Sequence, residues 1–202
     1  MLTRLAVIFV CYMLGGCAAD INQRTAENYV QAGHAAIRAG NWNAALQDFS
    51  RAMVNADLGH LDDDQKARFS YEYGRALGVT CHYPEAEKYL TQSKALAQQA
   101  NHSSYLPLYE LGLLHEAQGK PAAALDNFAE LVPQIERENL ESRAPLGVAD
   151  IYMRYAKALD ATGKPDEAAD ARKKSETLIS GNPNAMPLGS PTPYGTVCSQ
   201  AA

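Results

Sequence analysis

Few side chains of this sequence have the types and spacing that catalysis or metal binding would need. His115 and Glu116 begin a two-histidine zinc motif, but Gly119 stands where the second histidine would have to be. The chain also lacks the Gly-x-Ser-x-Gly pattern of serine hydrolases and any glycine-rich phosphate-binding loop. The sequence therefore contains no motif that supports hydrolysis or phosphoryl transfer.

Two further candidates are better explained by the structure that we expect around them. The three aspartates at 62–64 lack the glycine and the distal glutamate of a calcium loop, and they precede a predicted helix whose dipole favours negative charge. Cys81 has only His82 beside it, and adjacency in sequence does not give the geometry of a nucleophile and its base. The sequence therefore predicts that the protein is not an enzyme and holds no metal and no cofactor.

The four cysteines differ in their expected chemistry because the chain opens like an exported protein. Residues 1–4 carry a positive charge, residues 5–14 are apolar, and two glycines precede Cys17, which is the layout of a cleavable signal peptide. The apolar run is shorter than the roughly 20 residues that a membrane-spanning helix needs. We expect residues 1–16, with Cys11, to be removed and residues 17–24 to form a linker.

Residues 14–17 resemble the lipobox of bacterial lipoproteins, in which the cysteine carries lipid with fatty acyl chains such as palmitate. This resemblance implies that Cys17 is lipidated and anchors the chain to a membrane. In that family an aspartate after the cysteine tends to retain the protein in the inner membrane, whereas Ala18 stands here. The resemblance thus implies an outer-membrane anchor facing the periplasm. An ordinary secretory signal that happens to contain Cys17 is the alternative.

Export leaves Cys81 and Cys198 in an oxidising compartment, where two thiols are more often paired than free. The sequence leaves both states open and predicts a possible disulfide. The formal net charge of −5, which becomes more negative when Arg4 leaves with the leader, argues against nucleic acid as a partner.

Four internal segments align without gaps and share one pattern, a helix end followed by a helix start: 40–45, 81–86, 119–124 and 163–168. In three of them the first residue is glycine, which favours the left-handed conformation that ends a helix, and Cys81 replaces it in the second. Pro121 and Pro165 stand near the start of the following helix, where the missing N–H costs nothing. Apolar residues recur on both sides at three- and four-residue intervals, as in amphipathic helices.

These repeats resemble the tetratricopeptide repeat (TPR) across residues 25–178. Gly33, Ala45, Phe49 and Ala52 of the first repeat match the family pattern most closely. The expected fold is all-α, a right-handed α-solenoid of about four TPR-like helical hairpins, followed by an irregular proline- and glycine-rich tail at 179–202. The repeats are spaced more widely than the usual 34 residues, and a related solenoid of helical hairpins fits the same spacing.

In TPR proteins the first helix of each hairpin lines a concave groove, which implies a binding site for a peptide or protein partner. Two rows of residues occupy equivalent places in the four repeats: Val30, Tyr71, Tyr109 and Met153, and His34, Arg75, Leu113 and Lys157. We expect the tyrosines to be apolar anchors and Arg75 and Lys157 to attract an acidic or carboxylate-ended peptide. Ordinary solvated or half-buried helix residues are the alternative.

Together these features predict a lipid-anchored, non-enzymatic periplasmic TPR scaffold. Its expected role is to bind a peptide or protein partner in envelope or pilus and secretion assembly. The alternative is a regulator of a cell-wall hydrolase or synthase, built on the same array.

Overall fold

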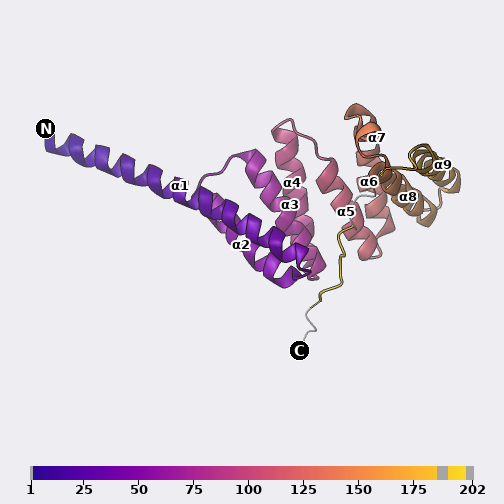
Figure 1. Cartoon of the computed structure of the whole chain (residues 1–202), viewed down its shortest axis with the longest axis horizontal. Coiled ribbons are helices and arrows are strands. Elements are labelled where there is room, and N and C mark those ends of the chain that lie inside the picture. The colour runs from indigo at the N-terminus through magenta and orange to yellow at the C-terminus, as the bar shows by residue number, and fades with distance from the viewer. Residues whose placement is uncertain (1, 186–190, 199–202) are drawn as a thin grey trace.

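The computed structural model describes residues 2–185 and 191–198, with side chains from Ala18 onward. Within these residues the chain is helical throughout, apart from turns and the tail, as the sequence predicts (Figure 1). The helices are α1 (Leu2–Arg38), α2 (Trp42–Leu58), α3 (Asp63–Val79), α4 (Tyr83–Gln99), α5 (Tyr105–Ala117), α6 (Pro121–Arg137), α7 (Leu140–Arg143), α8 (Pro145–Ala161) and α9 (Pro165–Gly181).

The helices pair into four hairpins, α1–α2, α3–α4, α5–α6 and α8–α9, with the short α7 placed before the last. Each hairpin packs on the next, through α2 with α3, α4 with α5 and α6 with α8. Figure 1 shows the hairpins following one another along the molecule as a solenoid, which confirms the predicted fold class. Helices of 17 residues explain the wide spacing, because two of them already fill a 34-residue repeat before any turn is counted.

The turn inside each hairpin has the left-handed conformation that the aligned segments predict. The first residue of each segment has positive φ: Gly40 at 73°, Cys81 at 69°, Gly119 at 67° and Gly163 at 80°. A Cβ at the three glycines would meet no neighbouring atom, so the backbone conformation alone explains the glycine there. Cys81 has the same left-handed conformation although it is not glycine, and it forms a disulfide bond with Cys198.

The hairpin cores depend on a small residue that faces a large one. A Cβ on Gly33 would lie 2.5 Å from Phe49 Cε1, and a Cβ on Gly112 would lie equally close to Phe128. Both phenylalanines are buried, so the paired helices approach closely only because these glycines have no side chain.

The ends of the array differ slightly from the predicted boundaries. Residues 17–24, expected to be a linker, belong to helix α1, and helix α9 continues to Gly181. The side chain of Cys17 lies outside the part that the structure describes, so its lipidation stays a prediction. Among the described residues, no helix has both the length and the apolar character needed to cross a membrane.

Candidate partner-binding site

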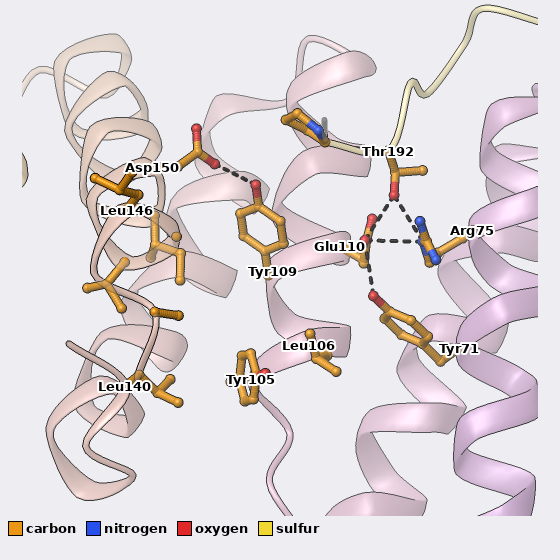
Figure 2. Close-up of a pocket in the computed structure, with 15 residues that line it drawn as sticks. Tyr71, Arg75, Tyr105, Leu106, Tyr109, Glu110, Leu140, Leu146, Asp150 and Thr192 are labelled. Atoms are coloured by element: carbon orange, nitrogen blue, oxygen red, sulfur yellow. Dashed lines mark hydrogen bonds and ion pairs between the residues drawn. The ribbon is translucent and has the colours of Figure 1, made fainter. Parts of the chain in front are cut away.

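A pocket of about 460 Å³ opens between α3, α5, α8 and the tail, among the first helices of three successive hairpins. Its apolar wall comes mainly from α5 and α8: Tyr105, Leu106, Tyr109, Leu146, Val148 and Ile151. Leu106 is 43% exposed although it is a large apolar residue. Figure 2 shows Tyr105, Leu106 and Tyr109 on one side of this space and Leu140 and Leu146 on the other. The arrangement provides an open apolar surface for a ligand.

The C-terminal tail lies along the same face. The segment from Pro191 to Cys198 returns from the end of the array to α3 and α5 (Figure 1). The Gly195 N–H donates to the carbonyl of Gly78 at 3.3 Å, and the Val197 N–H donates to the carbonyl of Val79 at 3.1 Å. The second and third hairpins therefore already hold a peptide segment on this face, which is part of this chain and which turns at Tyr194 and Gly195.

The tail is also covalently attached. Cys198 forms a disulfide with Cys81, and the two Cα atoms lie 5.2 Å apart. The sequence left this pairing open, and the structure confirms it. Because Cys81 stands at the turn between α3 and α4, the bond holds the end of the chain beside the second hairpin.

Glu110 of α5 is the centre of the polar contacts beneath the tail, and only 4% of its surface is exposed. The Tyr194 hydroxyl donates to its Oε2 at 2.7 Å, while the Thr192 and Tyr71 hydroxyls donate to its Oε1 at 2.9 and 3.2 Å. Arg75 Nε lies 3.3 Å from the same carboxylate and also donates to the Thr192 hydroxyl at 3.0 Å. Figure 2 shows Tyr71, Arg75 and Thr192 converging on Glu110.

The protonation states of this cluster follow from its burial. Burial raises the pKa of the Glu110 carboxyl, and Arg75 and the hydroxyl donors oppose this shift. Burial, followed by the nearby carboxylate, raises the pKa of Tyr194 well above 10, so its hydroxyl stays protonated and remains a donor. The cluster thus binds hydroxyl-bearing side chains through a carboxylate that an arginine supports.

A second polar network joins α5 to α8. The Tyr109 hydroxyl donates to Asp150, and the guanidinium of Arg154 binds both Asp150 and Glu116 at 2.7 Å. Burial and this hydrogen bond raise the pKa of Tyr109 above its usual value. The network fixes the orientation of the Tyr109 ring at the edge of the apolar pocket.

The structure brings together only part of the predicted groove. Tyr71, Arg75 and Tyr109 line the pocket described above. Val30 and His34 line a neighbouring hollow of about 300 Å³, to which Tyr71 also contributes. Met153 and Lys157 lie together farther along α8, beside Arg154 and Arg172. These residues mark successive hollows rather than one continuous groove.

Two of the predicted roles need correction. Leu113 is only 5% exposed and belongs to the apolar core that also contains Tyr194, so it does not line an open groove. Arg75 is paired with Glu72 at 2.9 Å and with Glu110, so its charge is compensated before any acidic peptide arrives. Lys157 is exposed but lies 3.4 Å from Glu116. The pocket therefore favours apolar side chains over acidic ones.

The possible disulfide already implied that the tail lies near the second hairpin, but sequence reasoning missed the binding of Thr192 and Tyr194 to Glu110. Thr192 and Tyr194 stand among prolines and glycines, where helical periodicity gives no information about position. Glu110 did carry a signal, since it is the only charged residue between Tyr105 and Leu114 in an otherwise mostly apolar helix. A lone carboxylate on such a helix indicates a buried partner.

His34 gives a pH-dependent test of the neighbouring hollow. Its Nε2 lies 3.2 Å from a Glu72 carboxylate oxygen, and this contact raises the pKa of His34 above 6.5. Because the pKa is higher in the folded state, the charged ring stabilises the fold below pH 6.5, and the contribution is lost as the pH rises through the folded-state value. We expect Glu72→Gln to lower the pKa of His34 in an NMR titration. The control is Glu27→Gln, on the same helix as His34, which should leave this pKa unchanged. A His34 pKa that does not respond to Glu72→Gln would contradict this assignment.

Nowhere in residues 18–185 and 191–198 do three or more histidine, cysteine, aspartate or glutamate side chains gather as a possible metal site. The contacts that the structure does show at this face are apolar packing, hydrogen bonds and ion pairs. They can hold a peptide segment by its side chains and backbone.

Comparisons with known proteins bear on the fold. No family model matches the sequence, and no curated protein matches it. The crystal structure of MamA superposes with a TM-score of 0.61 at 20% identity, covering 79% of this chain and 81% of that one. The crystal structure of BtubC (BKLC) from P. vanneervenii superposes with a TM-score of 0.72 at 14% identity, covering 82% of this chain and 67% of that one. The chain therefore has a TPR-like helical repeat fold.

Proposed function

We propose that this protein is a lipid-anchored, non-enzymatic scaffold of the bacterial cell envelope that holds an apolar segment of a partner protein. The segment would bind in the pocket between α5 and α8. The proposed setting is the outer membrane facing the periplasm, in envelope or pilus and secretion assembly.

The observation that carries the proposal is the continuity between the pocket and a bound peptide. Pro191 and Thr192 of the tail form one wall of the pocket, and the apolar surface continues past them along α5 and α8. This face thus already binds one peptide segment and leaves adjacent apolar surface open. Concave, mostly apolar sites with a few placed polar groups are the usual form of a ligand site.

The groups of the pocket that are not already paired within the protein determine which side chains a partner needs. Arg75 and Glu110 are paired with each other, and Arg154 is paired with Asp150. The available surface is then mainly the side chains of Tyr105, Leu106, Tyr109 and Leu146, because Val148 and Ile151 are buried. Aromatic and aliphatic side chains of a partner would bury this surface, with the paired polar groups at its rim.

Two features support the envelope setting. Residues 14–17 resemble a lipobox, and Ala18 follows the cysteine. The disulfide between Cys81 and Cys198 is of the kind that forms and persists in oxidising compartments such as the periplasm. Each is independent of the pocket.

Photo-crosslinking in cells tests the proposal. A photoreactive amino acid at Leu106, in the pocket, should yield a discrete crosslinked partner in the membrane fraction. The same group at Val54, which is 57% exposed on α2 and does not line the pocket, is the matched control. Crosslinks of equal yield and identity from both positions would mean that the pocket does not select the partner.

Tyr109→Ala is expected to weaken the complex by on the order of 2 kcal/mol, roughly thirtyfold in Kd, because the ring provides a large contact area in the pocket. Tyr109→Phe keeps the ring and removes only the hydrogen bond to Asp150, so it should cost much less. Calorimetric titration of the crosslinked partner, once identified, measures both. A Phe variant that loses as much as the Ala variant would show that the hydroxyl network is responsible, and not the apolar contact.

A further inference from the structure

The tail contacts reveal a second binding site, which lies beneath Thr192 and Tyr194 between α3 and α5. Every polar group that receives the tail belongs to the solenoid itself: the Glu110 carboxylate, the Arg75 guanidinium, and the carbonyls of Gly78 and Val79. Arg75 and Glu110 also pair directly with each other. The receiving surface is therefore built by the repeats and is complete without the tail.

The site recognises specific side chains. The Tyr194 ring lies against the bare backbone of Gly78, where a Cβ would come within 2.4 Å of the ring, so the glycine leaves a slot for an aromatic side chain. The phenol at the end of that ring reaches Glu110, and the hydroxyl two residues earlier bridges Arg75 and Glu110. Two backbone N–H groups then extend the contact along the end of α3. Gly195 has a φ of 73°, and a Cβ there would lie 2.5 Å from the Tyr83 hydroxyl, so this position needs glycine. The site thus selects the pattern hydroxyl, any residue, tyrosine, glycine.

The tail is held in this site by a bond that thiol chemistry can open. Cys198 is exposed, and within residues 191–198 the hydrogen bonds given above and the apolar packing of Tyr194 and Val197 are noncovalent. A dithiol reductant would donate two electrons and two protons, leaving Cys81 and Cys198 as thiols and itself becoming a disulfide. The tail would then be held by noncovalent contacts alone.

We propose that the surface beneath the tail is a peptide-binding site for another protein, and that the tail is its intramolecular occupant, released when a dithiol opens the Cys81–Cys198 disulfide. The ligand is a segment with serine or threonine two residues before a tyrosine and with a glycine directly after it, where the segment turns. The site rests on the proposed function in one respect, that this face binds peptide segments. It differs from the open pocket because it needs displacement of the tail.

The ligand that replaces the tail is a segment of another protein and not the tail of a second copy of this chain. A tethered tail meets its own site at an effective concentration in the millimolar range, far above the concentration of another copy of the same sequence. An identical tail cannot compete under these conditions, whereas a segment of higher affinity can. Reduction also removes the covalent advantage of the tail, which lowers the affinity that the foreign segment needs.

A peptide with the sequence of residues 191–198, carrying Cys198→Ser, is the probe, and it requires no knowledge of the natural partner. The acceptor is the full chain with Cys198→Ser and Tyr194→Ala, which removes the tether and the ring of the tail but leaves the site intact. We expect this acceptor to bind the labelled peptide at least tenfold more tightly than the oxidised wild-type chain does. Tyr194→Ala in the peptide, or Gly78→Ala in the acceptor, should each reverse this gain.

Equal binding by the oxidised wild type, or no binding to an acceptor whose far-UV circular dichroism matches the wild type, would overturn the proposal. If that acceptor does not fold, hydrogen exchange on the wild type decides. Reduction should accelerate exchange of the Gly195 and Val197 amides at least tenfold, while the Ala45 amide in α2 stays protected. Unchanged exchange at the two tail amides would overturn the role of the disulfide. A reduced chain that dimerises through its tails would overturn the assignment to a foreign segment. Because no step uses the natural partner, failure here leaves the open pocket untouched.

Discussion

Cys198→Ser is expected to lower the free energy of unfolding by about 2 to 5 kcal/mol under oxidising conditions. The disulfide closes a loop of 117 residues, and the chain-entropy model gives its largest effect for long loops. The loop includes every helix from α4 to α9, although in a solenoid each hairpin otherwise contacts only its neighbours. Losing the bond should therefore lower Tm by about 10 °C, measured by thermal melting followed by circular dichroism.

The matched control is the redox state of the sample. Reductant should lower the stability of the wild type to that of the Cys198→Ser variant and should leave the variant unchanged. If the oxidised wild type and the variant melt at the same temperature, the disulfide contributes nothing to the solenoid, and the tail is only locally attached.

Cys17→Ala is expected to release the protein from the membrane completely, provided that the leader is still removed. The variant should therefore be exported with an ordinary cleavable secretory leader in place of residues 1–16, because an uncleaved apolar leader could itself hold the chain at the membrane. One acyl chain gives only marginal binding, whereas two or more give stable anchoring, so the difference between lipidated and unlipidated protein should be all or none.

Fractionation of the periplasm and the membranes measures this effect. The wild-type sequence behind its own leader should appear in the membrane fraction and incorporate labelled palmitate, and Ala18→Ser should behave in the same way. A Cys17→Ala chain that stays with the membrane after leader removal would contradict the lipid anchor. A wild-type chain that appears in the periplasm without labelled palmitate would instead support the ordinary secretory signal.

Much of the fold could be predicted because the repeat imposes the same physical requirement several times. Gly40, Gly119 and Gly163 stand where a helix must turn back, and all three adopt the left-handed conformation. Phe49 and Phe128 face Gly33 and Gly112, so the spacing of small and large residues already indicated which helices pair. Cys81 was informative for the same reason, since a non-glycine residue at such a turn indicates a compensating contact.

The site was harder to predict because it depends on long-range contacts that no period encodes. Tyr71, Arg75 and Tyr109 were found because they occupy equivalent places in the repeats. Whether Arg75 is free depends on Glu72, one turn before it, and on Glu110 in the next hairpin. The return of Thr192 and Tyr194 to α5 depends on a chain path through an irregular segment. The positions of the helices and turns could thus be predicted from the sequence, whereas the binding of the tail to α3 and α5 could not.

The central claim is that the apolar pocket between α5 and α8 is the partner-binding surface. Measuring the affinity of two variants for the partner, each with one charge substitution, tests this claim. Leu106→Glu places a charge in the pocket, and Val54→Glu places the same charge on α2 outside it, at positions that are both exposed in the free protein. The account predicts that Leu106→Glu weakens binding of the crosslinked partner at least tenfold, because the carboxylate would be desolvated in the complex, while Val54→Glu leaves Kd unchanged. Unchanged affinity for Leu106→Glu, with or without a loss for Val54→Glu, would contradict it and place the binding surface elsewhere on the solenoid.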